Sequence, residues 1–465
     1  MTHVAVIGAY GSAGVAVAES LADRDLELTL IDDGEPGGGL CILRGCMPSK
    51  SVLSAGAHRF QARHDDRILE TPDVDLSAIV ERKDEQVLGF AEHRRDAVHR
   101  LTERENVEFI HESARFIDSR TLAVDEREIE ADYVVIATGS VVNVPDLPGM
   151  EEVEYRTSAD VLDATEFGNS GIVMGFGYVG LELVPYLTEV GGMDLTVIEH
   201  DERPLDEAPP EYGDTILDLY REEFGIEILT NATERSVESV AGGVRMEVER
   251  EGERETIEAD QLFCFTGRKP NLGGLGIENT DLSPGRGWVE ATMQARDDSH
   301  TFVVGDVNGH EPILHVAKEQ GYQAADNIVA HNQDREMVPY ENVSHHVIFS
   351  GLGVYPFARV GHTVESAREA GYDPIAVERF ADDDGVFKVK DVPEGLATLV
   401  VARDGTVLGY QGLHHHADSM AKTMQIVIEL GLDVRELPDR AYHPTLPEIL
   451  DGLFRVACTE VAGQS

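Results

Sequence analysis

Two cysteines, Cys41 and Cys46, stand five positions apart in a segment that reads Gly-Gly-Gly-Leu-Cys-Ile-Leu-Arg-Gly-Cys-Met-Pro-Ser-Lys. Four intervening residues in a Gly-rich setting let both sulfurs come within the roughly 7 Å Cα spacing that a disulfide needs. A helix start close by would favour a thiolate. The spacing is not that of zinc ribbons or thioredoxin-like sites, and no neighbouring Cys or His pair completes a tetrahedral metal site. Two unrelated core cysteines are the alternative, which the rest of the chain tests.

A Gly-rich turn near the start of the chain predicts the first dinucleotide site. It follows an apolar strand at 4–7 and precedes a helix, and the next strand, 28–31, ends at Asp32. In such a βαβ unit, backbone amides at the helix start hold a pyrophosphate and the acid binds a ribose hydroxyl. The glycines of the turn are Gly8, Gly11 and Gly14. Removing Tyr10 would restore the usual Gly-x-Gly-x-x-Gly, so we interpret Tyr10 as a one-residue insertion.

A second turn of the same kind follows an apolar strand at 171–174 and matches Gly-x-Gly-x-x-Gly without distortion. Its glycines are Gly175, Gly177 and Gly180. Two fingerprints on one chain imply two dinucleotides, and one flavin with one nicotinamide is the economical assignment. The following strand ends at Glu199, an acid that favours NADH, whereas His200 and Arg203 could meet the 2′-phosphate of NADPH.

The cysteine segment resembles the redox-active disulfide loop of the pyridine nucleotide–disulfide oxidoreductases, with Leu40 in place of the usual Thr. Other motifs of that family follow in order: Ala-Thr-Gly at 137–139, Gly-Arg-x-Pro-Asn at 267–271, Gly-Asp at 305–306 and His-Pro-Thr-x-x-Glu at 443–448. The resemblance covers essentially the whole chain. It implies that Cys41 attacks a substrate disulfide while Cys46 forms a charge-transfer contact with a flavin.

The resemblance also implies cofactor contacts, with FAD as the flavin. The FAD contacts are expected at Gly8, Gly11, Gly14, Asp32, Gly39, Ala114, Thr138, Gly139, Gly305, Asp306, Leu314 and His315. In the family the acid of Gly-Asp bonds the ribityl chain, and the helix after it covers the flavin edge. The nicotinamide nucleotide is expected at Gly175, Gly177, Gly180, Glu199, His200, Arg203 and Gly267.

Two further pairs complete the expected catalytic set. Lys50 follows the redox loop, and Glu182 matches the family position that pairs with this lysine. His443 and Glu448 match the acid–base signature. Histidine can protonate a leaving thiolate because its pKa lies near the working pH, and the carboxylate would orient the ring. In the family this pair faces the disulfide of the other subunit, so we expect a homodimer with a shared active site.

These motifs predict an α/β fold with two Rossmann-like dinucleotide-binding domains, as in glutathione reductase, and a C-terminal α+β dimerisation domain. The expected domains are 1–148 for FAD with the redox disulfide, 149–272 for NAD(P), 273–338 for the second part of the FAD domain, and 339–465 for dimerisation. A helical region at roughly 50–105, with a break near Pro72, carries charges that we interpret mostly as a solvated helix face. Three consecutive histidines, 414–416, cannot all face one ion, and no metal is expected.

The formal net charge of −49 argues against nucleic acid and anionic membranes as partners. The acid is spread along the chain, and only 7 of the 38 basic residues are lysine. Such a surface suits molar salt, where the Debye length is about 3 Å. No apolar run approaches the ~20 residues of a membrane span, and no signal peptide precedes the first strand. We therefore expect a cytoplasmic protein of an extreme halophile.

The substrate is expected to be a small-molecule disulfide. Mercuric reductases are disfavoured because they carry a C-terminal cysteine pair, whereas Cys458 is single, and because they lack His-Pro-Thr-x-x-Glu. Glu199 favours a dihydrolipoamide dehydrogenase. Tyr10, Leu40 and the cation Arg44 between the cysteines favour a small-thiol reductase, and the chain looks like the NADPH-dependent bis-γ-glutamylcystine reductases of extreme halophiles. A flavoprotein with only a structural or signalling role is a further alternative, in which the cysteines or the His–Glu pair are typically lost.

Overall fold

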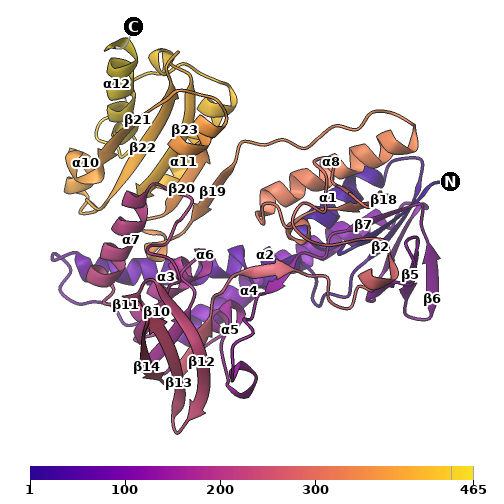
Figure 1. Ribbon diagram of the computed structural model, residues 1–465, viewed down its shortest axis with the longest axis horizontal. Helices are drawn as coiled ribbons and strands as arrows, with labels where there is room; N and C mark the ends of the chain where they lie inside the picture. Colours follow the sequence, from indigo (N-terminus) through magenta and orange to yellow (C-terminus); the bar gives the residue numbers. More distant parts are fainter. Residues whose placement is uncertain (441, 464–465) are drawn as a thin grey trace. The chain divides into compact units, whose positions relative to one another are not determined.

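The computed structural model describes residues 1–440 and 442–463, which group into two compact units (Figure 1). Unit 1 contains residues 1–48, 81–143 and 268–341, and unit 2 contains residues 49–80, 144–267 and 342 onward. Each unit therefore draws on three separate stretches of the sequence. Among the described residues, no helix is both long enough and apolar enough to cross a membrane.

Unit 1 is built on a six-stranded sheet in the order β17-β18-β7-β1-β2-β3. All strands except β17 run parallel to their neighbours. They are β1 (His3–Ile7), β2 (Glu27–Ile31), β3 (Val107–Ile110), β7 (Tyr133–Ile136), β17 (Gln294–Ala295) and β18 (Asp298–Val303). The central strands are continuous apolar runs, because both faces of a parallel sheet are covered. Val4, Ala5 and Val6 are completely buried.

Helices α1 (Ser12–Leu21) and α8 (Leu314–Asn332) pack against each other in unit 1 (Figure 1). They approach closely at Gly321, where a Cβ atom would lie 2.5 Å from the carbonyl oxygen of Ala13. Only glycine allows this approach. The remaining elements that lie wholly in unit 1 are α2 (Gly39–Leu43), β4 (Ala114–Phe116), β5 (Thr121–Val124), β6 (Arg127–Glu130), β8 (Ser140–Val142) and β16 (Arg268–Pro270). Helices α3 (Cys46–His64) and α4 (Leu76–Leu101) run through both units.

Unit 2 contains a second parallel sheet, in the order β11-β10-β9-β15, with an antiparallel sheet of β12, β13 and β14 beside it in the sequence. These strands are β9 (Ser170–Met174), β10 (Asp194–Ile198), β11 (Glu227–Leu229), β12 (Ala232–Val240), β13 (Gly243–Arg250), β14 (Glu253–Ala259) and β15 (Gln261–Cys264). The helices of this part are α5 (Ser158–Leu162), α6 (Tyr178–Glu189) and α7 (Pro210–Glu223). The arrangement is the second Rossmann-like fold that the sequence predicted.

The C-terminal part of unit 2 is a five-stranded antiparallel sheet in the order β19-β20-β23-β22-β21. Its strands are β19 (His345–Ile348), β20 (Phe357–Gly361), β21 (Pro374–Phe380), β22 (Gly395–Ala402) and β23 (Val407–His414), and its helices are α9 (Val364–Glu369), α10 (Gly385–Val389), α11 (Ala417–Glu429) and α12 (Glu448–Gly463). Helix α11 packs on β20 and β23, and α12 packs on β21 and β22. Sheet and helices together form the predicted α+β part.

A half-buried ion pair joins the start of β18 to the turn before β5. Arg120 donates two hydrogen bonds of 2.6 Å to Asp298, whose carboxylate also accepts from the Thr301 hydroxyl at 2.7 Å and from the His300 amide at 3.1 Å. Burial raises the pKa of Asp298, but these hydrogen bonds outweigh it and lower the pKa to about 2. The carboxylate form of Asp298 is therefore more stable in the native fold than in the unfolded chain.

We expect Asp298→Asn to lower the free energy of unfolding by about 2 kcal/mol at neutral pH. Since the native pKa is lower than the unfolded value of about 3.9, this contribution is complete above pH ~4 and disappears as the pH falls towards 2. Denaturant unfolding in molar KCl at pH 6 and at pH 3.5 measures it. Asp281→Asn, which changes an exposed acid, is the control. An equal loss for Asp298→Asn at both pH values would contradict the assignment.

Candidate active site

The two cysteines of the redox loop meet where α2 gives way to α3. Cys41 lies in α2, and Cys46 is the first residue of α3. Gly45 allows the loop to fold back, because a Cβ atom there would lie 3.1 Å from the carbonyl oxygen of Leu40 and 3.3 Å from the Cα of Cys41. Both cysteines are thiols in this structure, and their side chains share a hydrogen bond.

The environment of the pair makes its two sulfurs chemically different. The hydrogen bond to Cys46, burial, and the Cys46 charge together raise the pKa of the Cys41 thiol well above its usual range. Cys46 is exposed and stands at a helix N-terminus, which favours an anion. The helix N-terminus therefore favours negative charge at Cys46 rather than at Cys41, whose raised pKa keeps its proton in place until a base removes it.

A cavity of about 140 Å³ adjoins this pair in unit 1. Its lining combines both cysteines with the first Gly-rich turn, the Gly139 turn and the Gly305-Asp306 turn. The lining residues that the sequence predicted as FAD contacts are Gly11, Gly39, Gly139, Gly305, Asp306 and Leu314. The remaining predicted contacts, Gly8, Gly14, Asp32, Ala114, Thr138 and His315, do not line it. The glycines Gly11, Gly38, Gly39, Gly139 and Gly305 leave backbone exposed in this lining, which suits close approach of a cofactor.

The first Gly-rich turn accommodates its extra residue by burying it. The Tyr10 side chain is 2 % exposed, and its hydroxyl bonds Nε2 of His99 at 2.7 Å. The Tyr10 ring fills the space beside Gly37, where a Cβ atom would lie only 2.9 Å from it. Helix α1 still begins at Ser12, directly after the turn. Tyr10 therefore leaves the cavity-lining glycines in place, and it ties the turn to the segment that leads into the redox loop.

Two predicted FAD carboxylates are already oriented by hydrogen bonds. Asp32 accepts from the amides of Tyr10 and Gly34, both at 2.8 Å, and burial raises its pKa. Asp306 accepts from the Ser140 hydroxyl at 2.7 Å, and Nε of Arg268 donates to that hydroxyl at 2.8 Å. Ser140 directly follows the Ala-Thr-Gly motif, and Arg268 belongs to the Gly-Arg-x-Pro-Asn motif, but nothing in the sequence predicted a role for either. Their contact joins strands β8 and β16, which are far apart in the sequence.

Lys50 and Glu182 form the ion pair that the sequence predicted. The Lys50 ammonium lies 2.7 Å and 2.8 Å from the two carboxylate oxygens of Glu182, and it also donates to the Ser49 hydroxyl at 3.1 Å. Lys50 follows Cys46 by four residues in the same helix, so both side chains stand on one face, a turn apart. The backbone positions of Lys50 and Cys46 therefore lie one helical turn apart in α3.

The second Gly-rich turn is built as the sequence predicted. Gly175 has a φ of +93°, and a Cβ atom there would lie 2.7 Å from the carbonyl oxygen of Phe265. A Cβ atom on Gly180 would lie 2.6 Å from the carbonyl oxygen of Gly175. Gly177, where nothing lies within 4 Å, leaves its backbone open at the start of α6. Gly267, which follows strand β15, has a φ of +84°.

The side chains that would distinguish the two coenzymes follow β10. Burial raises the pKa of Glu199, which accepts a hydrogen bond from the Asp201 amide. His200 and Arg203, the two candidates for a 2′-phosphate, are paired with acids: Nε2 of His200 lies 2.6 Å from Glu234, and Nε of Arg203 lies 2.9 Å from Asp214. A phosphate would have to compete with these carboxylates.

His443 and Glu448 are held together at the start of α12. Nδ1 of His443 lies 3.0 Å and 3.2 Å from the two oxygens of Glu448. The Thr445 amide, at 3.0 Å, and His443 lower the pKa of Glu448, so the acid stays ionised. The His443 side chain is 79 % exposed, which leaves the imidazole accessible to a group outside its own subunit. Oriented by an anion on one nitrogen, the ring can exchange a proton on the other.

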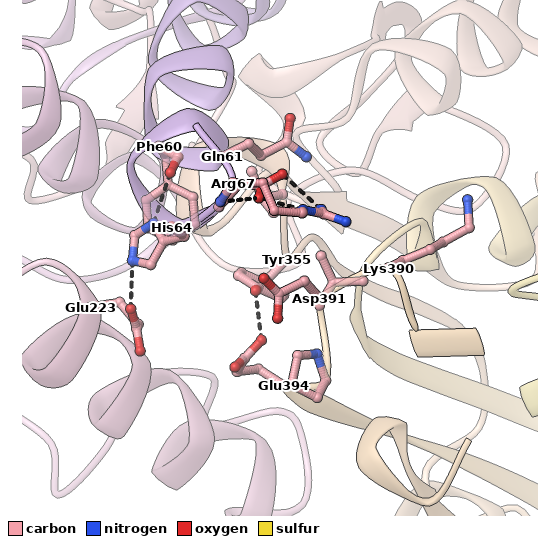
Figure 2. A pocket seen from close by; sticks show the side chains of 13 residues that line it. Phe60, Gln61, His64, Arg67, Glu223, Tyr355, Lys390, Asp391 and Glu394 are labelled. Atoms are coloured by element: carbon pink, nitrogen blue, oxygen red, sulfur yellow. Dashed lines mark hydrogen bonds and ion pairs between the residues drawn. The ribbon is translucent and has the colours of Figure 1, made fainter. Parts of the chain in front are cut away.

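The C-terminal part of helix α3 carries ion pairs to other elements of unit 2. Nε2 of His64 lies 2.6 Å from Glu223, and Arg59 pairs with the buried Glu189. Figure 2 shows His64 and Glu223 at the edge of a cavity of about 350 Å³ in unit 2, where Tyr355 also bonds Glu394 at 2.6 Å. Most charged groups around this cavity are satisfied by one another. The ion pairs of His64 and Arg59 attach α3 to other elements of unit 2. These charges therefore do not belong to a simple solvated helix face, which the sequence predicted for most charges of this region.

Comparison with known proteins identifies the family. The family model for "Pyridine nucleotide-disulphide oxidoreductase" matches residues 2–321, and the model for its dimerisation domain matches residues 346–453. The chain belongs to the pyridine nucleotide-disulphide oxidoreductase family. Members of this family use FAD and NAD(P)H, so the predicted cofactor classes and the dimerisation domain are confirmed.

Individual relatives carry different names. The chain is 29% identical to a mercuric reductase of Bacillus cereus, over 93% of this chain and 67% of the relative. It is also 29% identical to a dihydrolipoyl dehydrogenase of Geobacillus stearothermophilus, over 96% and 94%. The solved structure of the HOCl-induced flavoprotein disulfide reductase RclA from Escherichia coli superimposes with a TM-score of 0.82 at 23% identity, over 98% and 99%. The enzyme class is thus shown, and the substrate is not distinguished by similarity.

Proposed function

We propose that this enzyme uses NAD(P)H and FAD to reduce the disulfide of a low-molecular-weight thiol, namely bis-γ-glutamylcystine, to two γ-glutamylcysteine molecules. One observation carries the disulfide chemistry. Cys41 and Cys46 line the same cavity as the glycines expected to hold FAD. FAD, when bound there, passes two electrons from NAD(P)H to the Cys41–Cys46 disulfide.

The reduced pair then performs two thiol–disulfide exchanges. The Cys41 thiolate attacks one sulfur of the substrate, so that a mixed disulfide forms and the first thiol leaves. The Cys46 thiolate attacks the Cys41 sulfur, so that the Cys41–Cys46 disulfide forms again and the second thiol leaves. Two electrons and two protons pass to the substrate in total.

His443 is the group proposed to remove the proton from Cys41 and to protonate the first leaving thiolate. Because the pKa of Cys41 is raised, its proton must be removed before attack, and the imidazole is the available base. The imidazolium then protonates the first leaving thiolate, while Glu448 stabilises its positive charge. The exposure of His443 agrees with a position against the disulfide of a second subunit.

Arg44 supports the choice of an anionic substrate. It lies between the cysteines at the end of α2 and is exposed. Bis-γ-glutamylcystine carries four carboxylates, and one of them could pair with this guanidinium. The Arg44 argument does not apply to lipoamide, which carries no carboxylate.

Dihydrolipoamide dehydrogenase is the second candidate because of the coenzyme site. The proposed substrate goes with NADPH, but Glu199 stands where NAD presents its ribose hydroxyls, and His200 and Arg203 already contact acids. The deciding experiment measures NADPH and NADH oxidation in molar KCl with bis-γ-glutamylcystine and with lipoamide. Turnover of the γ-glutamyl disulfide alone supports the proposal. Turnover of lipoamide with NADH supports the dehydrogenase, and turnover of neither contradicts both.

We expect Arg44→Ala to raise KM for bis-γ-glutamylcystine about fivefold and to leave kcat nearly unchanged. An exposed ion pair is worth up to about 1 kcal/mol, and molar salt screens all but direct contacts. Steady-state kinetics measure the change. Arg286→Ala, which removes another exposed arginine, is the matched control. An unchanged KM in Arg44→Ala would remove Arg44 from substrate recognition.

A further inference from the structure

The ammonium of Lys50 has a third contact besides Glu182 and Ser49. It lies over the ring of Phe349, 4.4 Å from the ring centroid. The backbone amide of the same Phe349 donates to a Glu182 oxygen at 3.2 Å. One residue therefore contacts both members of the ion pair. An aromatic face attracts a cation at this distance, and it also limits where the flexible lysine can move.

Phe349 is itself fixed by the residues that follow it, 350–353, in unit 2. The amide of Gly351 donates to the hydroxyl of Tyr220 at 3.0 Å, and that hydroxyl donates to the carbonyl of Leu181, next to Glu182. The Leu352 side chain fills a notch in α3, where a Cβ atom on Gly56 would lie 2.8 Å from it. The segment is thus attached to α3, α6 and α7.

The backbone of this segment is unusual. Leu352 has a φ of +63° and a ψ of +17°, a left-handed conformation that is unfavourable for a branched residue. Such a conformation persists only where the surroundings impose it. Here the notch at Gly56 and the bond to Tyr220 impose it, and the result is that Phe349 is held against Lys50 and Glu182.

We propose that Phe349 is a positioning residue that holds the Lys50 ammonium beside the redox helix, where it stabilises the Cys46 thiolate and supports electron transfer to the disulfide. This inference rests on the role proposed above for the cysteine pair. Without the ring, only Glu182 and Ser49 would hold the Lys50 ammonium, and its position beside the helix would be less restricted. The Cys46 thiolate would then lose part of its electrostatic support, and the reactive fraction at a given pH would fall.

The test uses the FAD-loaded enzyme in molar KCl with Phe349→Leu, which keeps an apolar side chain but removes the aromatic face. In a Cys41→Ser background, the charge-transfer absorbance that the Cys46 thiolate gives with bound FAD is followed against pH. We expect its titration profile to move to higher pH and the thiolate fraction below the midpoint to fall about threefold. In the otherwise unchanged enzyme, kcat for reduction by NAD(P)H is expected to fall by a similar factor with KM unchanged.

Two further variants make the result decisive. Phe349→Trp retains an aromatic face and should restore both the charge-transfer profile and kcat, whereas a purely structural role would not be rescued by this larger residue. Lys50→Met should move the profile further than Phe349→Leu does. If Lys50→Met shifts the profile and Phe349→Leu does not, the inference is wrong. If neither variant shifts the profile but disulfide reduction persists, Lys50 has no role and the proposed function stands without it.

Discussion

Replacing His443 by alanine is expected to lower kcat for disulfide reduction by about 10²- to 10⁴-fold, while NAD(P)H still reduces the enzyme at its normal rate. The two steps separate because the imidazole acts only when thiols gain or lose protons. Cys41 needs a base because burial and Cys46 raise its pKa. Stopped-flow measurement of the reductive step and steady-state turnover, made on the same preparation, give both rates.

Subunit mixing shows where the imidazole acts. Neither Cys41→Ser nor His443→Ala homodimers should turn over disulfide. If the site is shared across a dimer, a hybrid dimer contains one intact site, because Cys41 from one subunit meets His443 from the other. Random reassociation makes half the dimers hybrids, so roughly a quarter of the wild-type activity should return. If each subunit used its own His443, mixing would restore nothing.

Glu448→Gln is the matched control for orientation. It keeps the size of the side chain and removes the charge that faces Nδ1 of His443. The imidazolium would lose its counter-charge, so we expect a smaller fall in kcat than in His443→Ala, together with a lower pH for the basic limb of the profile. A fall in reductive rate in either variant would show that the pair acts elsewhere.

The sequence predicted the parts of the site that depend on local spacing. Glycines at fixed intervals determine a turn whatever surrounds it, and the positions of Gly175 and Gly180 follow from backbone contacts that no Cβ atom would permit. The cysteine spacing and the His443–Glu448 pair likewise lie within short motifs. The pairing of Lys50 with Glu182, 132 positions later, followed only from the resemblance to the family. The fold class followed from the same βαβ patterns.

Features that depend on distant partners could not be read in the same way. His200 and Arg203 were flagged as possible phosphate ligands, but the acids that pair with them come from other elements. Tyr10 was identified as an insertion, yet its burial depends on His99 in α4 and on the small size of Gly37. Phe349 lies 299 positions after Lys50 in a segment without a predicted role, so nothing local pointed to their contact.

The second large effect concerns salt. We expect the melting temperature to fall by roughly 10 °C or more when KCl is lowered from molar to about 0.1 M, and partial unfolding at still lower salt. The chain carries 87 acidic and 38 basic residues, and their net repulsion acts over a Debye length that grows from about 3 Å to about 10 Å across this range. The unfolded chain spaces these charges further apart, so weak screening favours it.

Two comparisons test this explanation. Asp382→Asn combined with Asp383→Asn removes two neighbouring exposed charges and should raise the melting temperature at low salt but not in molar KCl. Choline chloride at equal ionic strength separates screening from binding of the potassium ion. Equal protection by both salts supports screening, and protection by KCl alone means that acidic surface groups bind the cation. A melting temperature that does not change with KCl contradicts the halophilic interpretation, because the repulsion of 49 net charges would then have no measurable effect on the fold.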